Sequence, residues 1–265
     1  MPSRKLKNAP LIEAILEVRW GLQTQQRLGL GTPPLNLQTD PHYKLLLGRL
    51  FDRLQKYYPV HEQLPTALIP DEMVPQIVQH RFRAGENGWP LVQVGPGVFS
   101  LNETSNYDWV DFRERANAAV KMLFEAHPKV SDLKIENLIL RFIDAVEFDF
   151  QSEDVFAFLR DKMRVSISLP GVLFDSEAVP SKPVNFTWQT IFQCKTPGGV
   201  VLLKFDTGQK ENKPVLRWET MVQSLASDVP EMPKAFDTWL ATAHEVIDDW
   251  FFKLIAGDLE GRFSQ

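Results

Sequence analysis

The chain has 265 residues, of which 44% are hydrophobic and 24% are charged. This mixture can bury a core and leaves little room for long disordered segments. Acidic residues outnumber basic ones by 34 to 29, and the net charge of -5 has the wrong sign for a general phosphate-binding surface. The composition therefore predicts a globular protein and argues against a nucleic acid as its partner.

The sequence also indicates where in the cell the protein is located. No stretch approaches the roughly 20 apolar residues that cross a bilayer, which predicts a protein without a membrane partner. The single cysteine, Cys194, has no second cysteine with which to form an internal disulfide, as is common in a reducing compartment. We therefore expect a cytoplasmic protein.

The first half of the chain predicts a strand, a helix, a loop, three more strands and a second helix. Alternating apolar residues predict the strand at 11–22. Apolar residues spaced by threes and fours after Asp40 predict the helix, which ends before Pro59. Four prolines punctuate the loop at 59–75. The remaining elements are expected as strands at 76–83, 89–95 and 97–103 and a helix at 108–126.

The second half repeats this order of elements. A long strand is expected at 134–150, followed by a helix that Ser152 caps. Prolines again punctuate a loop, here at 166–183. The elements that follow are expected as strands at 184–195, 199–207 and 214–223 and a helix from Pro233 to Ala256.

Because one order of elements covers both halves, the sequence predicts an internal duplication. The alternative is that a common order arose by chance. The predicted fold class is α+β, with two modules at 1–130 and 131–265. Each module is a strand, a helix, a three-strand meander and a helix, with its antiparallel sheet covered by helices on one face. The two modules are expected either to be domains or to pack as one unit.

Short sequence blocks resemble a known family. They are Asn-Ala-Pro-Leu-Ile-Glu-Ala at 8–14 leading to Arg19 and Trp20, the Gln-Val-Gly-Pro-Gly hairpin at 93–97, and Leu-Arg-Phe-Ile-Asp at 140–144. These blocks resemble a sporadically distributed, uncharacterised family of prokaryotic proteins of similar length. The resemblance covers residues 8–150 and implies no activity, because the family has no assigned reaction from which a catalytic residue could be transferred.

Motifs for chemistry are missing from the sequence. The five histidines are scattered, and no pair has a metal-ligand spacing on one predicted helix. The glycines of Gly95-Pro96-Gly97 lie between two predicted strands, which favours a hairpin turn over a phosphate-binding loop. The sequence therefore predicts no catalytic residue, no metal site and no cofactor, and it favours a non-enzymatic protein.

Asp144 is the polar residue whose position needs an explanation. On a straight strand it shares the parity of Phe142, which places a carboxylate on the apolar face, where burial costs roughly several kcal/mol without a partner. Three solutions remain open. A bulge near Ala145 turns Asp144 outward, an arginine such as Arg19 or Arg217 pairs with it, or that pair lines a ligand site.

Two predictions of function follow. The first is a non-enzymatic binding or regulatory protein that engages a protein or peptide partner through the groove between the modules or through the apolar residues of its two long loops. The alternative is a small-ligand-binding protein or an enzyme with a polar site at the module junction. The candidate binding residues are Arg19, Trp20, Arg141, Asp144, Asp206, Leu68 and Phe174.

Overall fold

The computed structural model describes residues 6–21, 40–104, 107–176 and 178–265. Leu22, the last residue of the first predicted strand, lies outside this part of the chain. The described strands are β1 (Leu11–Trp20), β2 (Val60–Gln63), β3 (His80–Arg83), β4 (Leu91–Gly95), β5 (Val98–Glu103), β6 (Ile135–Glu147), β7 (Thr187–Cys194), β8 (Gly199–Lys210) and β9 (Lys213–Leu225). The described α-helices are α1 (Tyr43–Leu54), α2 (Trp109–Ala126), α3 (Val155–Lys162), α4 (Phe236–Ile255) and α5 (Asp258–Ser264).

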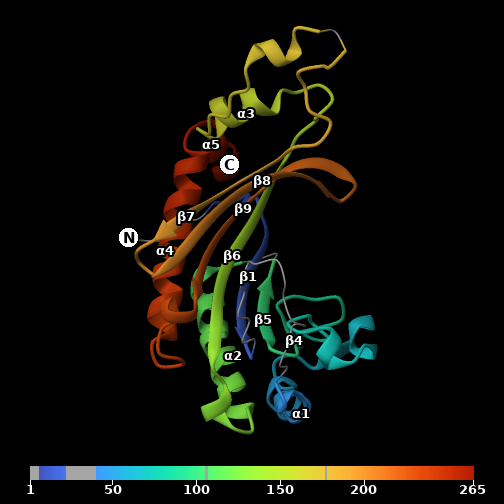
Figure 1. Ribbon diagram of the computed structural model, residues 1–265, viewed down its shortest axis with the longest axis vertical. Coiled ribbons are helices and arrows are strands. Elements are labelled where there is room, and N and C mark those ends of the chain that lie inside the picture. Colours follow the sequence, from blue (N-terminus) through green and yellow to red (C-terminus); the bar gives the residue numbers. More distant parts are fainter. Residues whose placement is uncertain (1–5, 22–39, 105–106, 177) are drawn as a thin grey trace, which may run out of the picture.

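All the described strands join one antiparallel sheet in the order β2-β3-β4-β5-β1-β6-β9-β8-β7 (Figure 1). The predicted α+β class is thereby confirmed. In each half the last strand of the meander returns to the first strand, so β5 pairs with β1 and β9 pairs with β6. Strands β1 and β6 then pair with each other and join the halves into a continuous sheet. A shared order of elements does not establish common descent, so the duplication stays a prediction.

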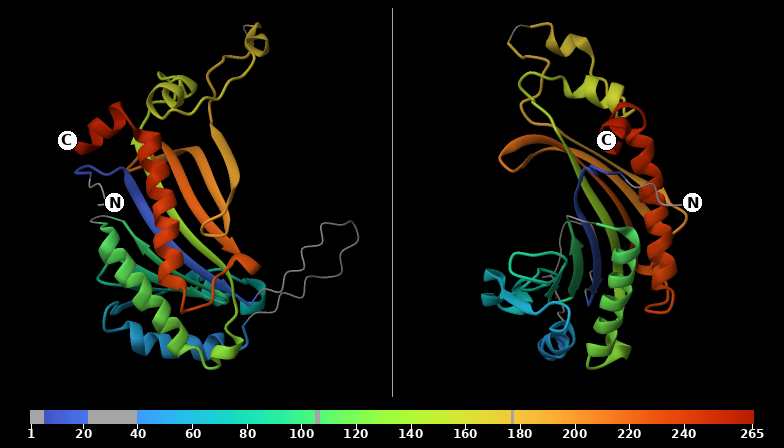
Figure 2. Two further views of the ribbon diagram at one scale, coloured as in Figure 1. Left: turned by 90° about the vertical axis from the view of Figure 1, so that its left-hand side faces the viewer. Right: turned by 180° about the vertical axis from the view of Figure 1, so that it is seen from behind.

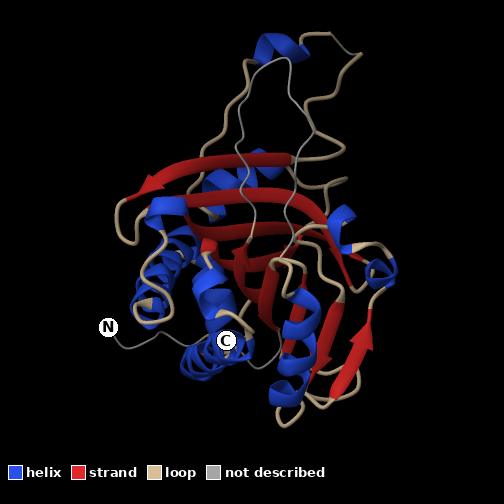
Figure 3. Ribbon diagram, turned by 60° about the horizontal axis from the view of Figure 1, so that its bottom comes forward, coloured by secondary structure: helices blue, strands red, loops and turns tan. Residues whose placement is uncertain are grey.

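The long helices lie along one face of the sheet (Figure 3). In β1 the alternation places Leu16 and Val18 beneath them, fully buried, and Arg19 on the opposite face. Helix α1 contributes the predicted apolar stripe to the same core. Its buried residues are Tyr43, Leu46, Leu50 and Leu54. The principal core therefore lies between the sheet and helices α1, α2 and α4.

The buried residues of a second apolar cluster all lie in the C-terminal half, and Leu6 of the N-terminal segment packs against them. The cluster joins the end of β6 to α3 and to α5, whose Leu259 and Phe263 are buried there. Helix α5 was not predicted from the sequence. It is short and follows Gly257, which has a φ of 112°, so sequence reasoning ended the last helix at this glycine and did not restart one.

Two further predictions of local structure need correction. Helix α3 begins at Val155 and is capped by Asp154, whose carboxylate accepts from two backbone N–H groups, whereas Ser152 donates its hydroxyl to Asp149. The loop at 59–75 contains strand β2, which pairs with β3. Its four residues lack an apolar alternation, so the pairing with β3 makes it a strand.

The segment between α3 and β7 extends beyond the end of the sheet (Figure 1 and Figure 2). It includes much of the predicted loop at 166–183, and several of its apolar side chains are exposed. Among the helices of the described residues, none combines the length and the apolar character needed to span a membrane.

Candidate functional site

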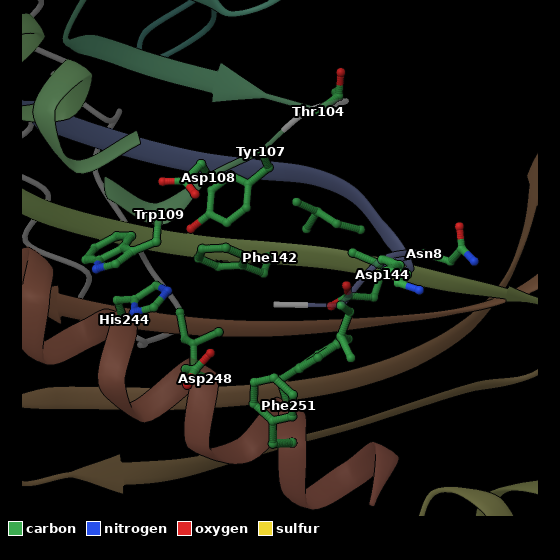
Figure 4. Close-up of a pocket in the computed structure, with 16 residues that line it drawn as sticks. Asn8, Thr104, Tyr107, Asp108, Trp109, Phe142, Asp144, His244, Asp248 and Phe251 are labelled. Carbon is green, nitrogen blue, oxygen red and sulfur yellow. The ribbon is translucent and has the colours of Figure 1, made fainter. Parts of the chain in front are cut away.

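A cavity of about 490 Å³ lies on the helix-covered side of the sheet, where the two halves meet. Its walls come from β6, from helix α4, from the start of α2 and from residues 6–9 of the N-terminal segment (Figure 4). Cavities that hold small organic molecules commonly have volumes of roughly 300–1,000 Å³. The cavity is therefore large enough for such a molecule.

Asp144 lines this cavity from β6. Strand β6 pairs with β9 in unbroken register at Asp144 and Ala145, so the predicted bulge near Ala145 is absent. The irregularity lies in the adjacent strand instead, between Leu11 and Glu13 of β1. Asp144 consequently keeps the parity of Phe142 and is only 3% exposed.

No described residue forms a hydrogen bond or an ion pair with the Asp144 carboxyl group. The arginines considered as partners lie elsewhere, since Arg19 donates to Glu17 and Gln76. Arg217 forms a bidentate pair with Asp206. The separation follows from sheet geometry, because Arg19 is on the opposite face and is paired with Asn137, about 23 Å along β6 from Asp144.

Burial changes the acidity of this carboxyl group. Loss of hydration raises the pKa of Asp144 to about 8. The Asp144 carboxyl group is therefore mostly protonated at neutral pH. It can accept or donate a proton in that range, and it can serve as a hydrogen-bond donor or, once ionised, as a counter-ion.

Aromatic side chains form much of the cavity wall. Trp109 at the start of α2 stacks on His244 of α4, with ring centroids 3.6 Å apart. Figure 4 shows this pair at one end of the cavity and Asp144 near Asn8 at the other. Burial, reinforced by the charge of Arg113, lowers the pKa of His244 to about 4. His244 is therefore neutral at pH 7.

Tyr107 places its ring against Phe142, with centroids 5.4 Å apart. Its hydroxyl group is buried and has no hydrogen-bond partner among the described residues. Burial raises the pKa of Tyr107 well above its usual value, so the phenol stays neutral. The next residue, Asp108, caps α2 by accepting from the backbone N–H of Val110, which fixes the position of Tyr107 and Trp109 at the cavity.

Comparison with known proteins does not assign this chain to a family. No family model matches the sequence, and no curated protein resembles it significantly. The resemblance to a prokaryotic family therefore stays a prediction.

Of the candidate binding residues, Asp144 alone lines the cavity. Trp20 is buried in the core and donates its Nε1–H to Asp40 at 2.8 Å. The carboxylate of Asp40 also lies 3.1 Å from Nε2 of His127 at the end of α2. Trp20 thus links β1 to Asp40, and through Asp40 to His127 at the end of α2, which is a structural role.

The other candidates are dispersed. Arg141 and Asp206 lie on the opposite face of the sheet, with Arg141 3.7 Å from Glu219. Leu68 is 82% exposed in the loop at 59–75, and Phe174 lies half-buried in the segment that extends past α3. The polar site expected from Arg19, Arg141, Asp144 and Asp206 together is therefore not formed.

Sequence reasoning missed the residues that complete the cavity, above all His244 and Asp248 of α4. These two residues lie one turn apart beside the buried stripe that contains Leu240 and Ile247. Polar residues at this spacing along an apolar stripe were the available signal. Among the described residues, no group of three His, Cys, Asp or Glu side chains is placed to hold a metal ion.

Proposed function

We propose that this chain is a binding protein that holds a small organic molecule in the cavity between β6 and α4. The observation that carries the proposal is the Asp144 carboxyl group, which is buried at the cavity wall and has no partner among the described residues. A buried ionisable group without a partner weakens a fold. Such a group in a cleft is a common mark of a functional site.

The composition of the cavity supports the same proposal. Small-molecule sites usually combine aromatic walls with a few polar groups. Here Trp109, Phe142 and Phe251 supply aromatic surface, and Asp144 and Asp248 supply carboxyl groups. The cavity also lies where β1 meets β6, so a ligand there would contact both halves of the chain.

The first test is thermal unfolding of the protein against a collection of small organic molecules. A ligand at 100 times its Kd stabilises the folded state by about 2.7 kcal/mol. We expect some compounds to raise the Tm of the wild type and not that of Ala9→Trp, because Ala9 is exposed at the cavity wall and a large ring there would obstruct the cavity.

Asp52→Asn is the matched control, since Asp52 is exposed on α1 and does not line the cavity. This variant should respond to the compounds as the wild type does. Compounds that stabilise Ala9→Trp as strongly as the wild type would show that they bind elsewhere. If no compound depends on an open cavity, the proposal fails.

A protein partner is a second candidate function, favoured by the segment that extends past α3. Its exposed apolar side chains have no packing role in the isolated chain, and such surfaces often dock on a partner. Val172 is 70% exposed and Val184 fully exposed. The further exposed apolar residues of this segment are Leu169, Leu173 and Val179.

Affinity purification from the native host tests this candidate. A partner that binds the segment should be recovered with the wild type and lost with the double variant Val172→Ser and Leu173→Ser. The Tm of the variant should be unchanged, because both side chains are exposed. Equal recovery with both proteins would contradict a role for the segment.

A further inference from the structure

Resting on the proposed function, we propose that the ligand of the cavity is an organic cation. Its ammonium or guanidinium group would lie against the Asp144 carboxylate, and its apolar body would lie against the aromatic walls. Asp144 would then act as the counter-ion of the ligand.

The charges around the cavity favour a cation over an anion. Among the residues that the structure describes, three aspartates line it, namely Asp108, Asp144 and Asp248, against one lysine, Lys7. Lys7 is exposed on the N-terminal segment, whereas the neutral His244 adds no positive charge. An anionic ligand would lie against the Asp144 carboxyl group, which has no hydrogen-bond or ion-pair partner among the described residues, whereas a cation would be attracted to the ionised form of that group.

The aromatic walls favour the same class. The rings of Tyr107, Phe142 and Phe251 line the cavity that contains Asp144 (Figure 4). The face of an aromatic ring attracts an organic cation, and more strongly where water is excluded. A carboxylate beside several rings can therefore hold the charge of a cation, while the rings cover its apolar part.

Binding of a cation is expected to be coupled to the release of a proton. Before a ligand binds, the Asp144 carboxyl group is protonated below about pH 8, and the cation is attracted to the ionised form. The affinity for the cation should therefore increase by up to about tenfold for each unit by which the pH rises towards 8, and it should level off above pH 8. Within the described part of the chain, the other ionisable groups at the cavity are Lys7 of the N-terminal segment, Tyr107 and Asp108 before α2, and His244 and Asp248 of α4.

Isothermal titration calorimetry with defined probes tests the assignment. Benzyltrimethylammonium, whose charge does not titrate, and benzamidine represent cations, with benzyl alcohol as the neutral probe and benzoate as the anion. At pH 8.5 we expect at least one cation to bind at least tenfold more tightly than the other two probes. Its affinity for the wild type should fall at least tenfold at pH 6, and at pH 7 binding should release a proton.

The variants separate the role of Asp144 from the shape of the cavity. Asp144→Asn should lose at least tenfold in affinity for the cation at pH 8.5 and should lose the pH dependence. Asp52→Asn should bind as the wild type does. Thermal unfolding of each variant verifies that the cavity is still folded.

The outcomes distinguish this inference from the proposed function. If neither cation binds at pH 8.5, if benzyl alcohol or benzoate binds as tightly, or if Asp144→Asn keeps full affinity, the cation assignment is overturned. Neutral or anionic compounds that need an open cavity in the Ala9→Trp comparison would still support a small-molecule site. The absence of any such compound overturns both.

Discussion

At the scale of single residues, Asp144 shows how a carboxyl group can lie in a core and weaken it. The group is buried on the face that Phe142 and Val146 share, and its pKa rises from 3.8 to about 8. Between these values the folded state keeps a proton that the unfolded state has released. Stability therefore falls as the pH rises from about 4 to 8, and it stays at the lower level above pH 8.

Replacing Asp144 with asparagine should remove this pH dependence. Asparagine has a similar shape and no charge, so the variant should gain about 1.4 kcal/mol over the wild type for each pH unit between 4 and 8. Its advantage in the free energy of unfolding should then be up to about 4 kcal/mol larger at pH 8.5 than at pH 5. Urea unfolding at both pH values measures the difference.

A constant difference between the two proteins would contradict the raised pKa of Asp144. A variant less stable than the wild type at pH 8.5 would show that the carboxylate is ionised and well paired in the folded state. Asp52→Asn should follow the wild type at both pH values, because its side chain is exposed.

At the scale of elements, Gly97 allows the turn between β4 and β5 to form. Gly97 has a φ of 78°, and a Cβ atom there would lie 2.6 Å from the carbonyl oxygen of Trp20. The backbone N–H of Trp20 also donates to the Gly97 carbonyl at 3.0 Å. The turn predicted from Gly95-Pro96-Gly97 is thus present, and it packs against the end of β1.

Alanine should therefore have opposite effects at two glycines. Gly97→Ala should lower the free energy of unfolding by at least about 1–2 kcal/mol, because it combines an unfavourable φ with a backbone clash. Gly48 lies on the exposed face of α1, and a Cβ atom added there would have no atom within 4 Å. Gly48→Ala should therefore raise the free energy of unfolding by about 0.5–1 kcal/mol. Thermal unfolding of both variants tests the prediction, and a Gly97→Ala protein as stable as the wild type would contradict it.

At the scale of the whole molecule, the pairing of β1 with β6 ties the two halves together. Their register extends from Leu11 opposite Asp144 to Trp20 opposite Ile135. The principal core likewise draws on both halves, with Leu16 from the first and Leu240 from the second. A boundary near residue 130 therefore falls within one continuous sheet and one shared core.

We expect the two halves to unfold together. Strand β5 pairs with β1, and β9 pairs with β6. In native-state hydrogen exchange, the most protected backbone amides of β5 and of β9 should therefore have the same free energy of opening. The buried residues of the second apolar cluster come only from the C-terminal half. Protection of β9 that persists after β5 has exchanged would show that the C-terminal half is a separate unit.

The sequence by itself determined the features that depend on local periodicity. Alternating apolar residues predicted β1 and β6, and an apolar stripe predicted α1. Each of these patterns arises because one face of the element is buried. The same alternation put Asp144 on the apolar face. It could not identify a partner, and the arginine of β1 that was considered lies on the opposite face of the sheet.

Only the tertiary structure decided what surrounds Asp144. Trp109, His244 and Asp248 reach the cavity because α2 and α4 pack on the same face of the sheet, over sequence separations that no local pattern encodes. Strand β2 and helix α5 likewise depend on distant partners. The periodicity of a segment fixes which side chains share a face, whereas long-range packing decides which faces meet, and the cavity is formed where these faces meet.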